Sequence, residues 1–145
     1  MRPWHDFHVD GYHVDGTRRE ISFDLAWPYD TPTDARRARI LFERVEAYFL
    51  EYDLGSNIVY DFSERPLRGF LEEWTQRFES SAKYGWPAFW RPAPYPQRSV
   101  EVELDDAYRL LSERSAKCVQ LASSYGLSGW VIAANVREEI LSDRQ

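Results

Sequence analysis

The sequence of 145 residues contains one cysteine, Cys118, and no long apolar run. A single cysteine can form neither an internal disulfide nor a cysteine-rich metal knuckle, which is typical of a reducing compartment. The longest apolar runs, such as 130–134, are far shorter than the roughly 20 residues that cross a bilayer, and the N-terminus has no signal-peptide pattern. We therefore expect a cytoplasmic protein without a membrane partner.

Clustered basic residues are also missing. The formal net charge is −6, whereas non-specific affinity for nucleic acid depends on groups of Lys and Arg side chains. The sequence predicts no nucleic-acid partner, although an acidic surface can steer a protein toward a basic one. Nucleophile elbows, phosphate-binding glycine loops and HExxH pairs are absent, so we expect neither an enzyme of those classes nor a cofactor.

Large side chains, by contrast, are abundant. Hydrophobic residues make up 43% of the chain, which includes 6 Trp, 9 Tyr and 8 Phe. Residues of this kind supply a core and argue against a disordered chain. The length is that of one domain, which we expect to span 1–145.

Two segments with alternating apolar residues, 7–11 and 21–27, flank a turn at Asp15-Gly16 and predict a β-hairpin. A two-residue turn would mix the apolar and polar faces. A longer or bulged turn restores one apolar face by setting Phe7 opposite Leu25.

The structure of 38–52 is ambiguous from periodicity. Its apolar residues fit a helical stripe, and they also fit a strand with a bulge at Glu43-Arg44. Periodicity alone slightly favours the helix. The next segment, 57–62, has the pattern of a strand.

A main helix is predicted over about 66–83, with Pro66 in its first turn and Gly85 as its stop signal. The proline- and aromatic-rich segment 86–96 then predicts a structured loop.

The last third of the chain predicts a strand at 100–104, a short helix at about 105–113, and strands near 118–122 and 130–134. A helix continuing over 105–123 is the alternative.

Three stretches together resemble a loose group of small, mostly uncharacterised bacterial proteins, some of which are similar to immunity proteins of toxin systems: FERVEAYFLEYDLGSNIVYDFSERPLRGFL, the GWP that follows, and SSYGLSGWVIAANV. The resemblance implies that 40–52 is a strand. It also implies an α+β fold, in which a curved antiparallel sheet of about six to seven strands, or a partial barrel, packs against one main helix. No catalytic residues come with it.

The N-terminal histidines and aspartates are candidate metal ligands, since imidazole and carboxylate groups bind transition ions. The candidates are His8, Asp10, His13 and Asp15. In a regular strand His8 and His13 point to opposite faces, so only a bulge would gather them. Ordinary strand and turn polarity is the alternative.

The aromatic loop is the candidate binding surface, with Trp86, Phe89, Trp90 and Tyr95 as its large side chains. Rings on a proline-stiffened loop lose little entropy on binding. Alternatively, they cover one side of the sheet and complete the core. Cys118 is expected to be a buried structural residue, although the neighbouring Lys117 makes a reactive thiol the alternative.

Three functions are consistent with these features. The first is a non-enzymatic binding protein, specifically an immunity-type inhibitor of a cognate bacterial toxin. The second is a small-molecule-binding domain with an apolar pocket, and the third is a metal-dependent enzyme using the His/Asp cluster.

Overall fold

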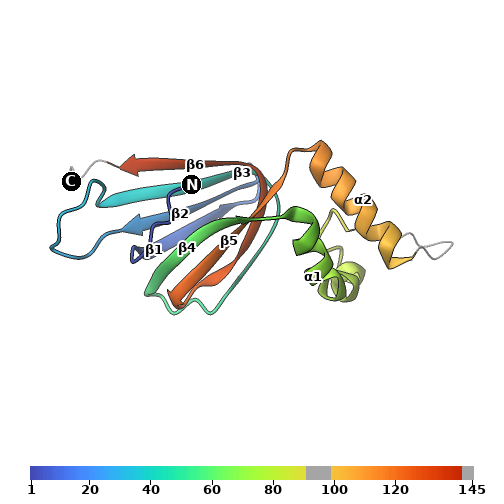
Figure 1. Ribbon diagram of the computed structural model, residues 1–145, viewed down its shortest axis with the longest axis horizontal. Coiled ribbons are helices and arrows are strands. Elements are labelled where there is room, and N and C mark those ends of the chain that lie inside the picture. Colours follow the sequence, from blue (N-terminus) through green and yellow to red (C-terminus); the bar gives the residue numbers. More distant parts are fainter. Residues whose placement is uncertain (91–98, 142–145) are drawn as a thin grey trace.

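The computed structural model describes residues 1–90 and 99–141, which form six β-strands and two α-helices (Figure 1). The strands are β1 (His8–Asp15), β2 (Glu20–Ala26), β3 (Arg37–Glu51), β4 (Asn57–Arg65), β5 (Lys117–Tyr125) and β6 (Ser128–Leu141). The helices are α1 (Leu67–Ser81), followed by a 3-10 turn at Ala82–Tyr84, and α2 (Val100–Glu113).

The strands form a closed antiparallel barrel in the order β1-β2-β3-β6-β5-β4. The α+β class and the antiparallel pairing are confirmed. The predicted curved sheet of six to seven strands with one main helix is wrong in two respects, because the sheet closes on itself and the two helices are almost equally long.

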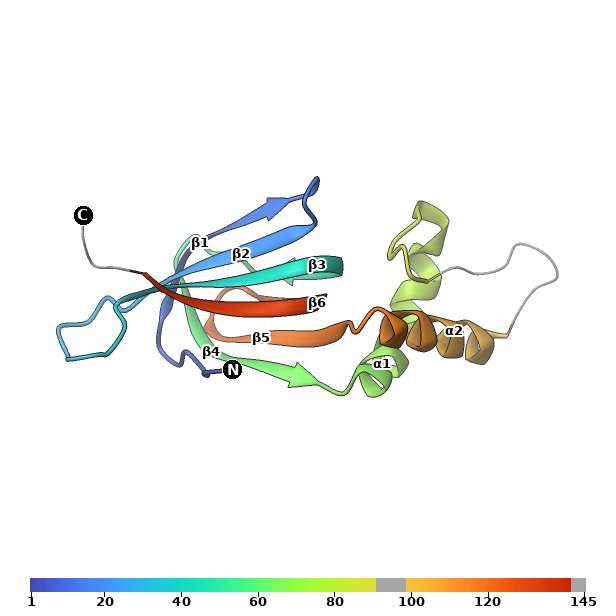
Figure 2. The ribbon, with the colours of Figure 1, turned by 90° about the horizontal axis from the view of Figure 1, so that it is seen from above.

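Closure of the barrel depends on a short contact between β1 and β4. Only His8 with Ile58 and Val9 with Asn57 are paired across it. Beyond these pairs the two strands diverge toward the helical end, where they form opposite edges of a fan of strands (Figure 2). The barrel is thus closed at one end and flared at the end that faces the helices.

The barrel interior holds the first of two cores. Alternate residues of the strands point inward, as expected for a barrel with a polar exterior. The largest fully buried side chains of this core are Trp4, Ile21, Phe23, Leu25, Ile40, Phe42 and Leu127.

The second core lies between the outer face of the sheet and the helices. In β6, Val131 and Ala133 face the barrel interior, whereas Trp130 and Ile132 pack against the helical layer. The middle of β6 is therefore buried on both faces, which explains its unbroken apolar run.

Strand β3 spans the ambiguous segment, so the strand prediction is confirmed. Phe42 and Val45 both belong to the interior core although two residues separate them, and Arg44 takes a left-handed backbone with φ of 53°. This is the phase shift expected at Glu43-Arg44. The pairing of β3 with β6 keeps its register there, however, so the predicted bulge is misplaced. The register shift lies between Val45 and Ala47, and it turns Ala47 toward the helices.

The N-terminal hairpin has both a longer turn, over 16–19, and a bulge between Val9 and Gly11. The predicted pair is wrong, because Val9 rather than Phe7 lies opposite Leu25. Phe7 precedes β1, and its carbonyl oxygen accepts a hydrogen bond from the Val59 amide at 2.9 Å.

Helix α1 matches the predicted main helix, shortened to 67–81, with Pro66 at the N-cap. Gly85 ends the following 3-10 turn in a left-handed conformation, with φ of 76°. Its predicted role as a stop is confirmed. Strands β5 and β6 confirm the two predicted near the C-terminus, which excludes a helix over 105–123.

Helix α2 begins at Val100, so the strand predicted at 100–104 is wrong and the short helix predicted at 105–113 is only its later part. The alternating valines are exposed. The Ser99 side chain accepts a hydrogen bond from the Val102 amide. Two glutamates lie in the first turn, where their negative charges interact favourably with the positive end of the helix dipole. Helix capping therefore outweighs a short β-like alternation.

Close approach of β3 and β6 at Gly129 yields the first prediction. Gly129 has φ of 155°, and a Cβ there would lie 1.8 Å from the Phe49 carbonyl oxygen. Gly129→Ala should lower the free energy of unfolding by about 3 kcal/mol, measured by urea denaturation.

Gly69→Ala is the matched control. Gly69 lies within α1 with open space around its Cα, so the same change there should stabilise the protein by about 0.5–1 kcal/mol. Equal effects of the two substitutions would contradict the steric explanation.

Candidate functional site

Two of the four residues of the predicted aromatic surface belong to the core. Phe89 and Trp90 are 3% and 2% exposed and pack around Phe78 of α1, with ring centroids 5.5 and 5.6 Å away. They cannot contact a partner in this conformation. Both agree with the alternative interpretation, in which the rings cover one side of the sheet and complete the core. Tyr95 lies outside the described residues.

Trp86 differs because it is only partly buried. Its ring stacks on Trp130 at 6.0 Å between centroids, and its edge meets Phe78 at 5.7 Å. It therefore anchors the loop to the helical core while part of its surface remains accessible.

The accessible side of Trp86 lines a cleft of about 470 Å³ at the flared end of the barrel. The cleft has a predominantly aromatic wall, and its lining residues are Tyr12, Tyr48, Phe49, Leu50, Arg77 and Trp86. We call it the aromatic cleft.

Tyr12 and Tyr48 are exposed because the barrel is flared where they lie. Tyr12 is paired with Phe23, and Tyr48 with Val131, so both are on the face that points into the barrel. They are nevertheless 39% and 38% exposed. Interior-facing tyrosines near the rim of a barrel are placed to contact a ligand.

A smaller recess of about 210 Å³ adjoins the cleft and shares Tyr48 and Trp86 with it. At the recess the Glu46 carboxylate, whose side chain is 8% exposed, pairs with Arg19 at 3.2 Å and with Arg114 at 2.9 Å. The pairs join the β1–β2 turn, β3 and the end of α2, so the Glu46 carboxylate is already occupied by two guanidinium groups.

The predicted His/Asp cluster is not brought together. His8 lies 3.4 Å from the Tyr29 hydroxyl, Asp10 is 4.0 Å from Arg37, and Asp15 accepts a hydrogen bond from the Arg18 amide. Among the described residues no group of three or more His, Cys, Asp or Glu side chains has the geometry of a metal site.

The geometry of the two histidines explains this result. The bulge in β1 does place His8 and His13 on the same outer face, opposite Ala26 and Ser22 of β2. Four residues of strand separate those partners, which corresponds to about 13 Å. A single ion cannot bridge that distance.

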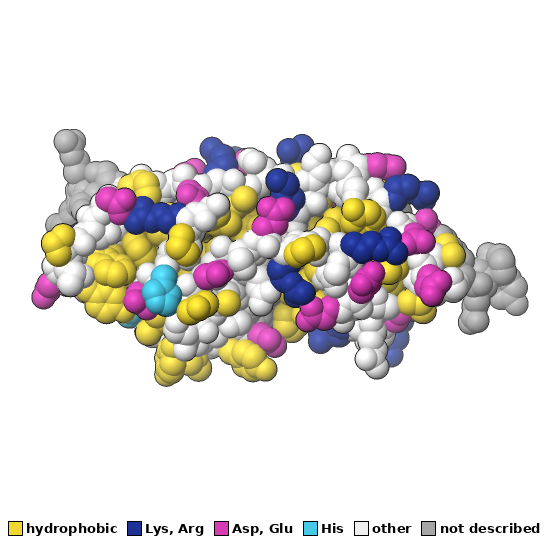
Figure 3. Space-filling view, viewed as in Figure 1, with side chains coloured by type: hydrophobic (Ala, Val, Ile, Leu, Met, Phe, Trp, Pro, Cys, Tyr) yellow, Lys and Arg dark blue, Asp and Glu magenta, His cyan; other side chains and the backbone are white. Residues whose placement is uncertain are grey.

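A second accessible surface lies at the turns next to β4. Its large side chains are between 55% and 71% exposed, and they are Tyr52, Leu54, Tyr60 and Tyr125. Figure 3 shows hydrophobic side chains projecting along the lower margin of the barrel, where Figure 1 places these turns. We call this set the tyrosine platform.

The platform is supported from below by Asn57, which is buried. Its side-chain oxygen accepts hydrogen bonds from the amides of Leu54, at 3.1 Å, and Leu127, at 2.8 Å. Its amide group donates to Asp53 at 3.0 Å. One side chain thus ties the β3–β4 connection to the β5–β6 turn.

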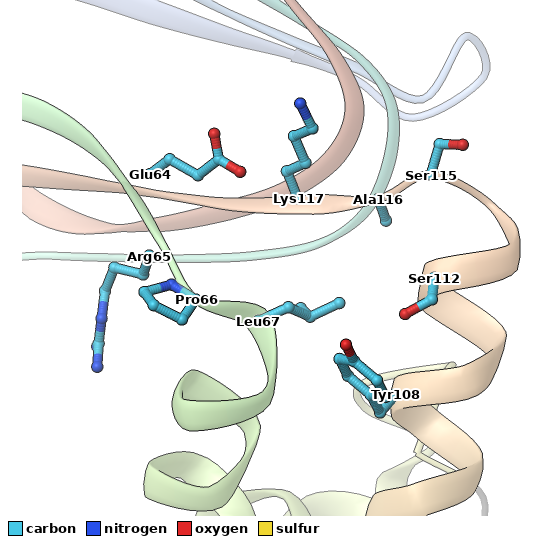
Figure 4. A pocket seen from close by; sticks show the side chains of 9 residues that line it. All are labelled: Glu64, Arg65, Pro66, Leu67, Tyr108, Ser112, Ser115, Ala116 and Lys117. Atoms are coloured by element: carbon cyan, nitrogen blue, oxygen red, sulfur yellow. The ribbon is translucent and has the colours of Figure 1, made fainter.

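A further hollow, of about 740 Å³, lies where β4 leads into α1. Figure 4 shows Leu67, Tyr108 and Ser112 facing one another between the helices, while the charged ends of Arg65 and Lys117 point away from them. The polar groups that converge here are the hydroxyls of Tyr108 and Ser112, without a charged group beside them, so this hollow offers little specificity for a charged ligand.

Sequence reasoning missed the residues that complete both surfaces, namely Tyr12, Tyr48 and Arg77 of the cleft and all four of the platform. Tyr12 lies outside the alternation of Phe7, Val9 and Gly11, and Tyr48 and Tyr52 fit the helical stripe of 38–52, so neither pattern indicates a site. Only the flare and the turn packing expose them, and no local pattern signals either.

Comparison with family models, curated proteins and solved structures found no match for this chain. Neither helix of the described residues is long and apolar enough to cross a membrane.

The hydrogen bonds of the Asn57 side chain yield the second prediction. Asn57→Ala leaves the Leu54 and Leu127 amides without their acceptor, and Leu127 is fully buried. The free energy of unfolding should fall by about 3 kcal/mol in urea denaturation. Asn135→Ala is the control, because it removes an exposed amide that is hydrogen-bonded to Glu43. It should change the free energy of unfolding by less than about 0.5 kcal/mol. Similar losses in both variants would contradict a stabilising role of the Asn57 hydrogen bonds.

Cys118 yields the third prediction. Burial in the helical core raises the pKa of its thiol to about 12, so the thiol is protonated and shielded at pH 8, as expected for a structural cysteine. Ellman's reagent should not react with the native protein at pH 8 and should titrate one thiol per chain after unfolding in guanidinium. Rapid labelling of the native protein would mean that Cys118 is accessible.

Proposed function

We propose that this protein is a non-enzymatic binding protein, specifically an immunity-type inhibitor that covers a cognate bacterial toxin through the tyrosine platform. The observation that carries the proposal is the exposure of four large side chains, three of them at strand ends and turns that a buried asparagine holds together and the fourth, Tyr60, in β4. Tyrosine is enriched at protein interfaces because it supplies a large contact area with few rotatable bonds.

The charge around the platform indicates the kind of partner. Segments 51–63 and 122–128 contain three acidic residues, Glu51, Asp53 and Asp61, and no basic one. Hydrogen bonds from Asn57 and from the Gly55 amide hold the pKa of Asp53 below its usual range, so this carboxylate stays ionised in mild acid. Such a surface complements a basic one, and opposite charges accelerate association.

Rigidity also supports a binding role. A surface that is already ordered loses little conformational entropy when a partner covers it. At Gly126, which has φ of 91°, a Cβ would lie 2.1 Å from the Asn57 side-chain oxygen, so the turn beneath the platform has no room for a side chain at this position.

The fourth prediction tests this proposal with the product of the gene adjacent to that of this chain. The two purified proteins should form a 1:1 complex in isothermal titration calorimetry, and the chain should protect cells that express the neighbouring product. Tyr52→Ser combined with Tyr125→Ser should weaken binding at least 100-fold, because exposed aromatic anchors dominate interface energetics.

Tyr84→Ser and Tyr108→Ser form the matched control, since both tyrosines are exposed but lie next to α1 and on α2. This double variant should bind like the parent protein. Absence of both complex and protection would refute the inhibitor proposal. Equal losses of affinity in the two double variants would show that the interface does not lie on the platform.

A further inference from the structure

We infer that the aromatic cleft is a binding site for a small aromatic carboxylate, a function independent of the protein interaction proposed above. The cleft joins an aromatic wall to one arginine whose guanidinium has no carboxylate partner among the described residues. The arginine determines the charge of the ligand, and the aromatic wall determines its ring system.

Arg77 defines the charge of the ligand. Its guanidinium carbon lies 5.2 Å from the centre of the Phe49 ring and 5.9 Å from that of Trp86. No ion pair within 4 Å joins it to an Asp or Glu of the described chain. In a protein of net charge −6, an arginine without a partner in a cleft favours an anion.

Nearby carboxylates do not compensate this charge. Glu73, one helical turn before Arg77, is paired with Arg65, and Glu46 in the adjoining recess is paired with two other arginines. None of the six residues lining the cleft is acidic. Asp53, outside the lining, interacts with the Tyr12 hydroxyl. No carboxylate of the described residues forms an ion pair with Arg77, so the cleft carries one guanidinium without a paired carboxylate.

One guanidinium matches one carboxylate. Its planar group presents two parallel N–H donors to the two carboxylate oxygens, and a phosphate with two charges usually requires further cations. The stacking of Arg77 on aromatic rings orders the guanidinium before a ligand arrives, which reduces the entropy cost of binding.

The walls define the body of the ligand. Tyr12, Tyr48 and Trp86 offer ring surfaces, and Leu50 adds an apolar contact. A cleft of about 470 Å³ lies in the range of ordinary small-molecule sites, which is roughly 300–1,000 Å³. A flat ring system stacks on such walls better than a flexible chain does.

The fifth prediction uses calorimetry on the full chain with 2-naphthoate and its neutral counterpart 2-naphthamide as probes. The carboxylate should bind 1:1 and at least 10-fold more tightly than the amide, since a charged hydrogen bond contributes about 1.5–3 kcal/mol. Arg77→Gln should reduce the affinity for 2-naphthoate to that for the amide, and Arg77→Lys should retain part of the preference.

Arg109→Gln is the matched control, because Arg109 is an exposed arginine of α2 that does not line the cleft. It should bind 2-naphthoate like the parent chain. The indole N–H resonance of Trp86, assigned with Trp86→Phe, should shift on adding 2-naphthoate.

Three results of the calorimetry would overturn the assignment. They are no saturable binding at millimolar probe, equal affinities for carboxylate and amide, and unchanged binding in Arg77→Gln. The Trp86 resonance could also shift when the protein partner is added but not when 2-naphthoate is added. That result would place the cleft in the protein interface and would refute the small-molecule site. None of these measurements depends on the tyrosine platform, so the two proposals fail separately.

Discussion

The irregular segment of β3 between Glu43 and Ala47 is the constraint on which the rest of the fold depends. A regular strand presents one face to one core. Here the left-handed backbone at Arg44 and the register shift between Val45 and Ala47 let a single strand serve two cores, because Val45 faces the barrel interior and Ala47 faces the helices. Such bulges bend a strand and increase its twist, as closure of a small barrel requires.

The same segment carries the charge that joins the layers. Glu46 is the residue added at the register shift, and its carboxylate reaches Arg19 and Arg114 from one position. The backbone is tied there as well, because the Val45 amide donates to the Arg19 carbonyl oxygen at 2.9 Å. A buried carboxylate with two guanidinium partners fixes the relative placement of hairpin, barrel and helix more strictly than apolar contacts alone.

Patterns in the sequence predicted the elements whose local and tertiary preferences agree. Helix α1 has its apolar spacing, its proline and its glycine stop, and the structure confirms all three. Prediction failed at 100–104, where the capping by Ser99 outweighed the alternation of valines. It also failed for barrel closure, since the two β1–β4 pairs join residues 50 and 48 positions apart and leave no local signal.

The candidate site was predicted least well, for a related reason. Trp86 was identified from composition, but Phe89 and Trp90 of the same loop are buried, because composition does not tell which side of a loop meets the core. Tyr12 illustrates how closely the two surfaces lie, since its ring lines the cleft while its hydroxyl helps to lower the pKa of Asp53 beside the platform. A change at Tyr12 therefore alters both surfaces, whereas Arg77 and Tyr52 each belong to one. For this reason Arg77 and Tyr52, rather than the shared tyrosine, distinguish ligand binding from protein binding.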